Sequence, residues 1–141
     1  MGTKRHIVVD RNGLPLAVTL TGANRHDSME LIPVINAIPP LRGKRGRPRK
    51  RPDKAHADKA YDFPRCRREL RNRGIAPRIA RRGIEDSSKL GKHRWVVERT
   101  FAWFNRFRRL TIRYERHADI YRAFFVIAAT LICFNAINRF C

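Results

Sequence analysis

Two β-rich runs around an Asn-Gly pair open the chain and constrain its fold more than any other feature. Residues 4–10 read KRHIVVD and residues 14–21 read LPLAVTLT, with Asn12-Gly13 between them. Asn-Gly between two such runs is the strongest short-range signal for a β-hairpin. The sequence therefore predicts an antiparallel hairpin over residues 4–21, as part of a sheet that later helices cover.

A helix is predicted after the hairpin, within HDSMELIPVINAI at residues 26–38. Asp27 is a candidate cap at its start. Four apolar residues then recur at helical spacing, Leu31, Val34, Ile35 and Ile38. Their spacing predicts one buried face on this helix.

The order strand, helix, strand is predicted for residues 54–79. Two short runs, 54–60 and 75–79, flank FPRCRRELRNRG. Pro64 lies in the first turn of that segment and Gly74 just past its end, which is the asymmetry of a helix. A crossover of this kind favours a parallel strand pair and an α/β sheet.

Two C-terminal helices are predicted within residues 92–139. The first, residues 92–110, has Val97, Phe101 and Phe104 on one apolar face. The second contains AFFVIAATLICF at residues 123–134, which we interpret as a buried core helix, because a membrane span needs about 20 apolar residues. The elements together predict one α/β domain over residues 1–141, a mixed sheet flanked by helices.

The chain carries a large positive charge. Its 32 Lys and Arg residues against 12 Asp and Glu give a formal net charge of +20. Charge of this size attracts nucleic acid by counterion release and makes the affinity depend on salt, without setting a sequence preference. A polyanionic partner is therefore expected.

The charge is densest in LRGKRGRPRKRP, residues 41–52. We predict a mobile basic loop over residues 42–52, at the rim of the face to which the next predicted strand brings Asp58. Its Gly46-Arg47-Pro48 centre is suited to a DNA minor groove. Its candidate DNA-binding residues are Arg42, Lys44, Arg45, Arg47, Arg49, Lys50 and Arg51. Two alternatives stay open: a non-enzymatic minor-groove binder, and an RNA binder that stacks bases on Trp95, Trp103 or Phe107.

The cysteines bear on cofactors and compartment. Cys66, Cys133 and Cys141 are far apart in the sequence and lack metal-ligand spacing, which argues against a structural zinc site. The chain starts without a signal-peptide pattern and has no disulfide framework, so the reducing cytoplasm is expected and a membrane is not.

Two carboxylates are candidates for catalysis. Asp58 stands near the end of the predicted strand 54–60, where α/β sheets place ligand and catalytic groups. Glu98 lies among cations on the predicted helix 92–110. Since Mg²⁺ prefers carboxylate oxygens and bridges to phosphates, the pair suggests a hard-cation site beside a nucleic-acid track.

Each carboxylate also has a purely structural interpretation. Glu98 is one helical turn from Arg94, so the two can form a surface ion pair. Asp58 or Asp62 can cap the helix that follows, and for Asp62 this is the preferred interpretation.

Three ordered blocks resemble a known family: TKRHIVVDRNGLPLAVTLTGANRHDS, HADKAYD and RWVVERTFAWFNRFRRLTIRYER. Together they resemble the C-terminal half of the DDE transposases of the bacterial insertion sequence five family. The resemblance covers almost the whole chain. It implies an RNase H-like fold, and a triad of Asp, Asp and Glu that holds two Mg²⁺ or Mn²⁺ ions for cleavage and strand transfer of insertion-sequence ends.

The resemblance assigns roles residue by residue. Asp58 matches the second Asp and Glu98 the Glu, both as catalytic metal ligands. In the family signature around the Glu, Arg94 matches the Arg, whereas Gly91 and Asn105 replace a Tyr and a Lys. The candidates for contact with flanking DNA are Arg94, Asn105, Arg106 and Arg109.

The first Asp of the family triad lies on a strand before the hairpin, and these 141 residues begin at the hairpin. We therefore expect a sheet that lacks its first strand, and a chain that is inactive alone. An upstream transposase segment would supply the missing Asp if the chain is the downstream frame of a divided gene; a decayed fragment is the alternative. The unpaired strand position also predicts self-association of the chain. The expected substrate is DNA of the nucleoid, both as transposon ends and as target.

Overall fold

The computed structural model describes residues 2–43, 46–83 and 87–140, except for the side chains of 87–94 and 139–140. It confirms the N-terminal hairpin, in which β1 (Thr3–Val9) pairs antiparallel with β2 (Pro15–Gly22). Gly13 at the turn has a φ of 83°, a conformation that side chains disfavour. The Asn-Gly pair thus identified the turn correctly, because the turn needs a residue with a positive φ and Gly13 provides it.

A second, parallel strand pair follows. β3 (Lys54–Ala57) pairs with β4 (Ala76–Ile79), and the crossover between them holds the short 3-10 helix η2 (Lys59–Tyr61) and α2 (Pro64–Asn72). The predicted strand, helix, strand order is confirmed. Among the described strands β1 and β2 pair only with each other, so the chain contains two separate two-stranded sheets.

One core cluster joins the strand pairs through helices. It forms around η1 (Asp27–Met29) and α1 (Leu31–Asn36), which lie where a helix was predicted. Its buried members are Leu31, Ile35, Ile38, Cys66, Leu70, Ile75 and Ile79. Val8 and Ala17 of the hairpin pack against this cluster, which therefore ties β1 and β2 to α1, α2 and β4.

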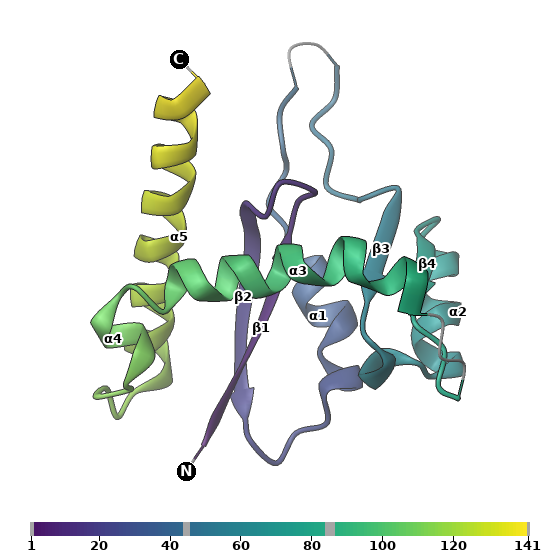
Figure 1. Ribbon diagram of the computed structural model, residues 1–141, viewed down its shortest axis with the longest axis horizontal. Helices are drawn as coiled ribbons and strands as arrows, with labels where there is room; N and C mark the ends of the chain where they lie inside the picture. The colour runs from purple at the N-terminus through teal and green to yellow at the C-terminus, as the bar shows by residue number, and fades with distance from the viewer. Residues whose placement is uncertain (1, 44–45, 84–86, 141) are drawn as a thin grey trace.

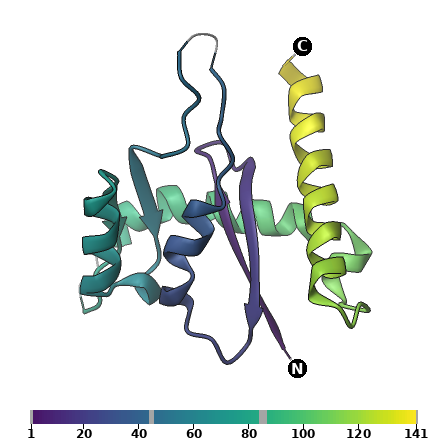
Figure 2. The same ribbon diagram turned by 180° about the vertical axis from the view of Figure 1, so that it is seen from behind.

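Three helices complete the chain: α3 (Ser87–Phe104), α4 (Arg108–Thr111) and α5 (Ala118–Phe140). α3 runs across both strand pairs, on the side that faces the viewer in Figure 1 and lies behind in Figure 2. The prediction of one helix through residue 110 is wrong, because α3 ends at Phe104 and α4 is a separate turn. The stripe buried on α3 is Val96, Thr100 and Phe104, whereas Val97 and Phe101 are only half-buried.

A second core cluster covers the other face of the hairpin. Its buried members are Phe104, Leu110, Tyr121, Phe125 and Ala128. Ile7 packs against it, whereas the next residue, Val8, packs against the first cluster. Successive side chains of a strand point to opposite faces, so the hairpin is the middle layer between two cores.

The prediction that α5 is a buried core helix is wrong for most of its surface. Among the described side chains of α5, only Tyr121, Phe125 and Ala128 are buried, and a window of the helix from Ala118 to Asn138 is 17% buried. The same window, with a mean hydropathy of 1.9, is long and apolar enough to cross a membrane by length and composition alone. In Figure 1 the C-terminal part of α5 projects from the rest of the chain.

Candidate functional site

Asp58 lies immediately after β3, at the C-terminal end of the parallel strand pair. It is the residue before η2, its side chain is exposed, and it makes no capping hydrogen bond to η2. Its position after a short strand is confirmed. The carboxylate is therefore accessible at the end of the sheet where α/β proteins bind ligands.

Two short helices meet beside Asp58. η1 packs against η2, which carries Tyr61. Burial, together with the charges of Asp27 and Asp58, raises the pKa of Tyr61 to about 12. Both carboxylates are thus close enough to the phenol to disfavour its ionisation.

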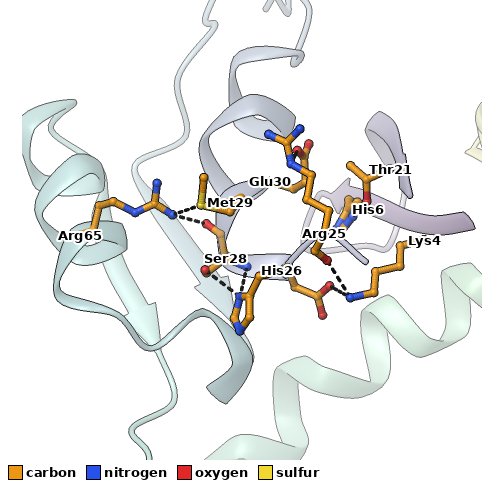
Figure 3. A network of polar contacts seen from close by, with 10 residues as sticks. Lys4, His6, Thr21, Arg25, His26, Ser28, Met29, Glu30 and Arg65 are labelled. Atoms are coloured by element: carbon orange, nitrogen blue, oxygen red, sulfur yellow. Dashed lines mark hydrogen bonds and ion pairs between the residues drawn. The ribbon is translucent and has the colours of Figure 1, made fainter. Parts of the chain in front are cut away.

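A polar network holds η1 in place (Figure 3). Lys4 on β1 donates to Asp27 Oδ1 at 2.9 Å and to the Arg25 carbonyl at 2.8 Å. Arg25 pairs with the buried Glu30 at 2.8 Å. Since each of these carboxylates already has a cationic partner, Asp27 and Glu30 are occupied by structural ion pairs and Asp58 is the accessible carboxylate of the group.

The same network orients His26. The Ser28 N–H donates to His26 Nδ1 at 3.2 Å, and the imidazole meets the Phe63 ring edge to face with centroids 5.2 Å apart. Arg65 on α2 donates to the Ser28 carbonyl at 3.2 Å. η1 is therefore fixed to β1 through Lys4 and to α2 through Arg65.

The prediction that Asp62 caps the following helix is wrong. The residue before α2 is Phe63, which makes no side-chain cap. Asp62 instead accepts hydrogen bonds from Arg67, the shortest at 2.7 Å, and from the Arg82 N–H at 2.9 Å. The Arg82 N–H is the main cause that lowers the pKa of Asp62, with the Arg67 guanidinium second. Asp62 thus ties α2 to the segment after β4.

Glu98 lies on the exposed side of α3. The opposite side of the helix is fastened to the hairpin turn, where the buried Thr100 Oγ1 donates to the Gly13 carbonyl at 2.6 Å and Arg99 donates to the Asn12 carbonyl at 2.5 Å. Glu98 and Thr100 are two positions apart in the sequence, which is about 200° around a helix. The suggested ion pair with Arg94 involves a side chain outside the described residues.

The basic loop lies between α1 and β3, as predicted, and projects from the chain (Figure 1). Leu41 and Arg49 close its base with two backbone hydrogen bonds of 2.7 and 2.8 Å. The prediction that the loop borders the face of Asp58 is wrong, because the loop enters the N-terminal end of β3 and Asp58 follows the C-terminal end. The four residues of β3 alone span about 13 Å.

The described cations of the loop fall into two groups. Arg49 pairs with Asp53 at 2.8 Å, and Arg51 donates to the Arg73 carbonyl at the end of α2 at 2.7 Å. The others are exposed, and no partner among the described residues is assigned to them: Arg42, Arg47 and Lys50. Lys44 and Arg45 lie outside the described residues. The first group shapes the base of the loop and the second is available to bind a polyanion.

A shallow depression of about 320 Å³ extends this basic surface beyond the loop. Its lining includes Lys50, Arg51 and Arg73, with Ile35 and Ile75 as apolar neighbours. Arg73 was not predicted as part of this surface, because it follows the loop by more than twenty residues and no local sequence pattern connects the two.

The predicted DNA contacts near Glu98 are not on one stripe. Because α3 ends at Phe104, Asn105 and Arg106 lie in a turn and Arg109 lies on α4. Arg109 is paired with Glu115 at 2.8 Å, Asn105 Oδ1 accepts from Arg5 at 3.4 Å, and Arg106 is exposed. Of the three, Arg106 is the exposed cation to which no partner among the described residues is assigned.

A stacked cation on α3 was not predicted. The Arg99 guanidinium lies over the rings of Trp95, at 4.4 Å, and Trp103, at 4.9 Å. The spacing of four residues on either side of Arg99 is the signal that points to it. Both indoles thus contact an intramolecular cation, which differs from the open stacking platforms that the RNA-binding alternative requires.

Comparison with known proteins identifies the family. Residues 1–133 match the protein family that is described as "Transposase DDE domain". The chain belongs to the DDE transposase family. The resemblance to transposases of insertion sequences is confirmed by a relative from Burkholderia cepacia, named "Putative transposase for insertion sequence element IS402", which is 57% identical over 138 residues.

The match spans 98% of this chain and 65% of the IS402 relative, so about a third of that transposase has no counterpart in these residues. No solved structure matches the chain.

Divalent metal ions are the cofactors of DDE transposases, and the residues of this chain fit such a site in part. Asp58 and Glu98 carry the oxygen ligands that hard cations prefer. However, the described residues contain no group of three His, Cys, Asp or Glu side chains that could hold a metal ion. Asp58 and Glu98 are thus of the right ligand type, and the described residues do not complete a centre.

Proposed function

We propose that this chain is the part of a transposase catalytic domain that carries Asp58 and Glu98, and that it acts in DNA transposition. The observation that carries the proposal is the exposed Asp58 at the C-terminal end of β3, within a family match over residues 1–133. A bound Mg²⁺ or Mn²⁺ pair would polarise the DNA phosphodiester for cleavage and strand transfer. Asp58 and Glu98 supply two of the ligands, and a further carboxylate comes from a segment outside these residues.

The complete domain, in this proposal, has an RNase H-like fold. β1 and β3 each pair with one neighbour among the described strands, so each has an edge at which another strand can be added. An upstream transposase segment that adds a strand there joins the two pairs into one mixed sheet. That strand also brings the first Asp of the triad to the same sheet as Asp58.

Double-stranded DNA is the proposed substrate, as transposon ends and as target in the nucleoid. The net charge of +20 supports it, as do the exposed loop cations Arg42, Arg47 and Lys50. Because the loop is at the opposite end of β3 from Asp58, it binds duplex away from the reacting phosphate. Arg106 is the proposed cation nearer to α3.

The decisive experiment supplies the missing part in trans. The residues of the IS402 relative that lie outside the match are added to this chain, and Mg²⁺-dependent cleavage of IS402-type ends is measured. We expect Asp58→Asn and Glu98→Gln each to abolish cleavage while DNA binding stays within about twofold. Asp119→Asn, an exposed carboxylate on α5, is the matched control and keeps full activity.

Cleavage that survives both substitutions rules out the assignment of these carboxylates. DNA binding without cleavage in every combination, with a preference for A·T tracts that is lost in Arg47→Ala, favours the alternative of a non-enzymatic minor-groove binder. The exposed Gly46-Arg47-Pro48 segment of the loop is the observation that supports this second function.

A further inference from the structure

The end of the parallel strand pair at which Asp58 lies has an exposed cation of its own, Arg82. Ala57 of β3 is opposite Ile79 of β4, and the Ala80 N–H donates to the Ala57 carbonyl at 3.2 Å. The chain therefore leaves β4 beside Asp58, and Arg82 is the third residue after that strand. The basic loop enters the opposite end of β3, so a cation for a phosphate at Asp58 has to come from another segment.

Two contacts hold the Arg82 guanidinium close to Asp58. Its Nε donates to the carbonyl of Lys59, the residue after Asp58, at 3.2 Å. Its Cζ lies 4.5 Å from the centre of the Phe63 ring, within the range of a cation–π contact. A guanidinium that is already held in this way gives up little further freedom when it binds a ligand, so Arg82 is oriented before DNA arrives.

The two terminal nitrogens of Arg82 are available for a ligand. Among the described residues no acceptor is assigned to Nη1 or Nη2, and no ion pair joins the guanidinium to Asp58. The side-chain partner of the nearby Asp62 is Arg67, and Arg82 contributes only its backbone N–H to that carboxylate. The Arg82 side chain thus offers a positive charge and a planar pair of donors, which match the two non-bridging oxygens of a phosphodiester.

A fixed cation is needed where a phosphodiester approaches a carboxylate. Asp58 is exposed and negatively charged, so it repels a DNA phosphate that comes near it. An Arg side chain at the same position offsets this repulsion and stabilises the charge of the transferring phosphoryl group. Arg82 is held one residue away from Asp58 and has the chemistry for both tasks.

We propose that Arg82 binds the non-bridging oxygens of the DNA phosphodiester that is cleaved at Asp58. This assignment rests on the proposed function, because it takes Asp58 as the place of cleavage. Arg82 lies outside the three sequence blocks that resemble the transposase family, so the resemblance gives it no role. The site differs from that of the loop cations, which bind duplex at the opposite end of β3.

Two substitutions separate binding of phosphate from support of the fold. Arg82→Gln places its Nε2 where Arg82 has Nε, so it keeps a donor for the Lys59 carbonyl and removes the charge. Arg82→Lys keeps the charge and has no donor at that position. We expect Arg82→Gln to lower cleavage by the completed domain about tenfold or more, and Arg82→Lys to retain more activity than Arg82→Gln. The reverse order overturns the proposal, because it assigns Arg82 to holding η2.

A binding measurement provides a second readout that does not depend on cleavage. In this chain alone, Arg82→Gln should make the slope of log K against log salt concentration shallower by about 0.9, whereas Arg82→Lys keeps the wild-type slope. Arg78→Gln, an exposed cation on β4, is the matched control for the loss of one charge. An Arg82→Gln variant that keeps the wild-type slope overturns the contact with phosphate.

Methylphosphonate substitution identifies the phosphate. Each phosphate around the cleaved bond of an IS402-type end is neutralised in turn, and the affinity of the completed domain is measured by fluorescence anisotropy. In the wild type and in Arg78→Gln, neutralising the cleaved phosphate should weaken binding about tenfold. In Arg82→Gln it should have no further effect, because the two partners of one contact do not lose their contributions additively. Additive losses, or coupling to a different phosphate, overturn the proposal.

Failure of this proposal is distinguishable from failure of the proposed function. Cleavage that requires Asp58 and Glu98 but is unchanged in Arg82→Gln overturns the role of Arg82 and leaves the transposase assignment in place. Coupling between Arg82 and one phosphate, without cleavage in any combination, supports the contact with phosphate and counts against the proposed function.

Discussion

Removal of three loop cations is expected to weaken DNA binding by an amount that depends on salt. Arg42, Arg47 and Lys50 are exposed, and no partner among the described residues is assigned to them, whereas Arg49 pairs with Asp53. The triple variant Arg42→Ala, Arg47→Ala and Lys50→Ala therefore removes phosphate contacts without breaking the base of the loop.

The magnitude follows from counterion release. Each phosphate that a cation neutralises contributes about −0.9 to the slope of log K against log salt concentration. Three lost contacts make that slope shallower by about 2.7. Relative to about 1 M salt, where the variants converge, the loss of affinity grows to roughly 500-fold at 0.1 M, or about 3.7 kcal/mol.

Fluorescence anisotropy with a labelled duplex, titrated at several salt concentrations, measures the slope. The control variant Arg68→Ala, Arg78→Ala and Arg122→Ala removes the same charge from three exposed sites on α2, β4 and α5. If both variants change the slope equally, net charge governs binding and the loop has no special role. An unchanged slope in the loop variant refutes the reasoning, since the loop then faces away from DNA.

Three further outcomes concern stability, measured by urea unfolding. Thr100→Val leaves the buried Gly13 carbonyl without its donor and should lower the free energy of unfolding by about 1–2 kcal/mol. The control Thr130→Val, at an exposed position of α5, should change it by less than about 0.5 kcal/mol. Equal losses of stability in the two variants contradict the proposed anchor. Burial lowers the pKa of His6 in the folded chain, so the unfolded chain takes up a proton first as the pH falls. Stability is therefore lost as the pH falls from about 6.5 through the folded pKa of His6. His6→Gln should remove this loss of stability, and an unaltered pH profile of stability in the variant contradicts the prediction. The pKa of Asp62 is also lowered, so its contribution to the stability of the fold is present above about pH 4 and is lost on further acidification. The variant Asp62→Asn should therefore be less stable than the wild type at pH 7 and approach the wild-type stability at low pH.

Local sequence signals predicted most of the elements because each has a local physical cause. Asn12-Gly13 identified the hairpin through a turn that needs a positive φ, which Gly13 adopts. Pro64 and Gly74 bracketed α2 because one is tolerated in the first turn and the other ends a helix, with a φ of 67°. The position of Asp58 at a strand end followed from these boundaries.

Features set by tertiary contacts were not predictable. The end of α3 at Phe104 has no proline or glycine to mark it, and it is buried in the second core cluster, so the periodic pattern through residue 110 was misleading. The stripe that α3 buries includes the polar Thr100, whose hydroxyl donates both to the Val96 carbonyl one turn earlier and to the distant Gly13 carbonyl. The spacing of apolar residues therefore predicted that α3 is a helix but gave the wrong buried face.

The relation between Asp58 and Glu98 depends on contacts that neither motif contains. Asp58 is attached to the parallel pair β3 and β4, whereas Glu98 is attached to α3, which Thr100 fastens to the hairpin. In the described residues no strand hydrogen bond joins the hairpin to β3, so side-chain packing and the crossing helix alone set the separation of the two carboxylates. A strand added between β1 and β3 would replace that packing by a hydrogen-bonded ladder on both sides. In the proposed complete domain, the segment that supplies the first Asp would thus also fix the positions of Asp58 and Glu98 relative to each other.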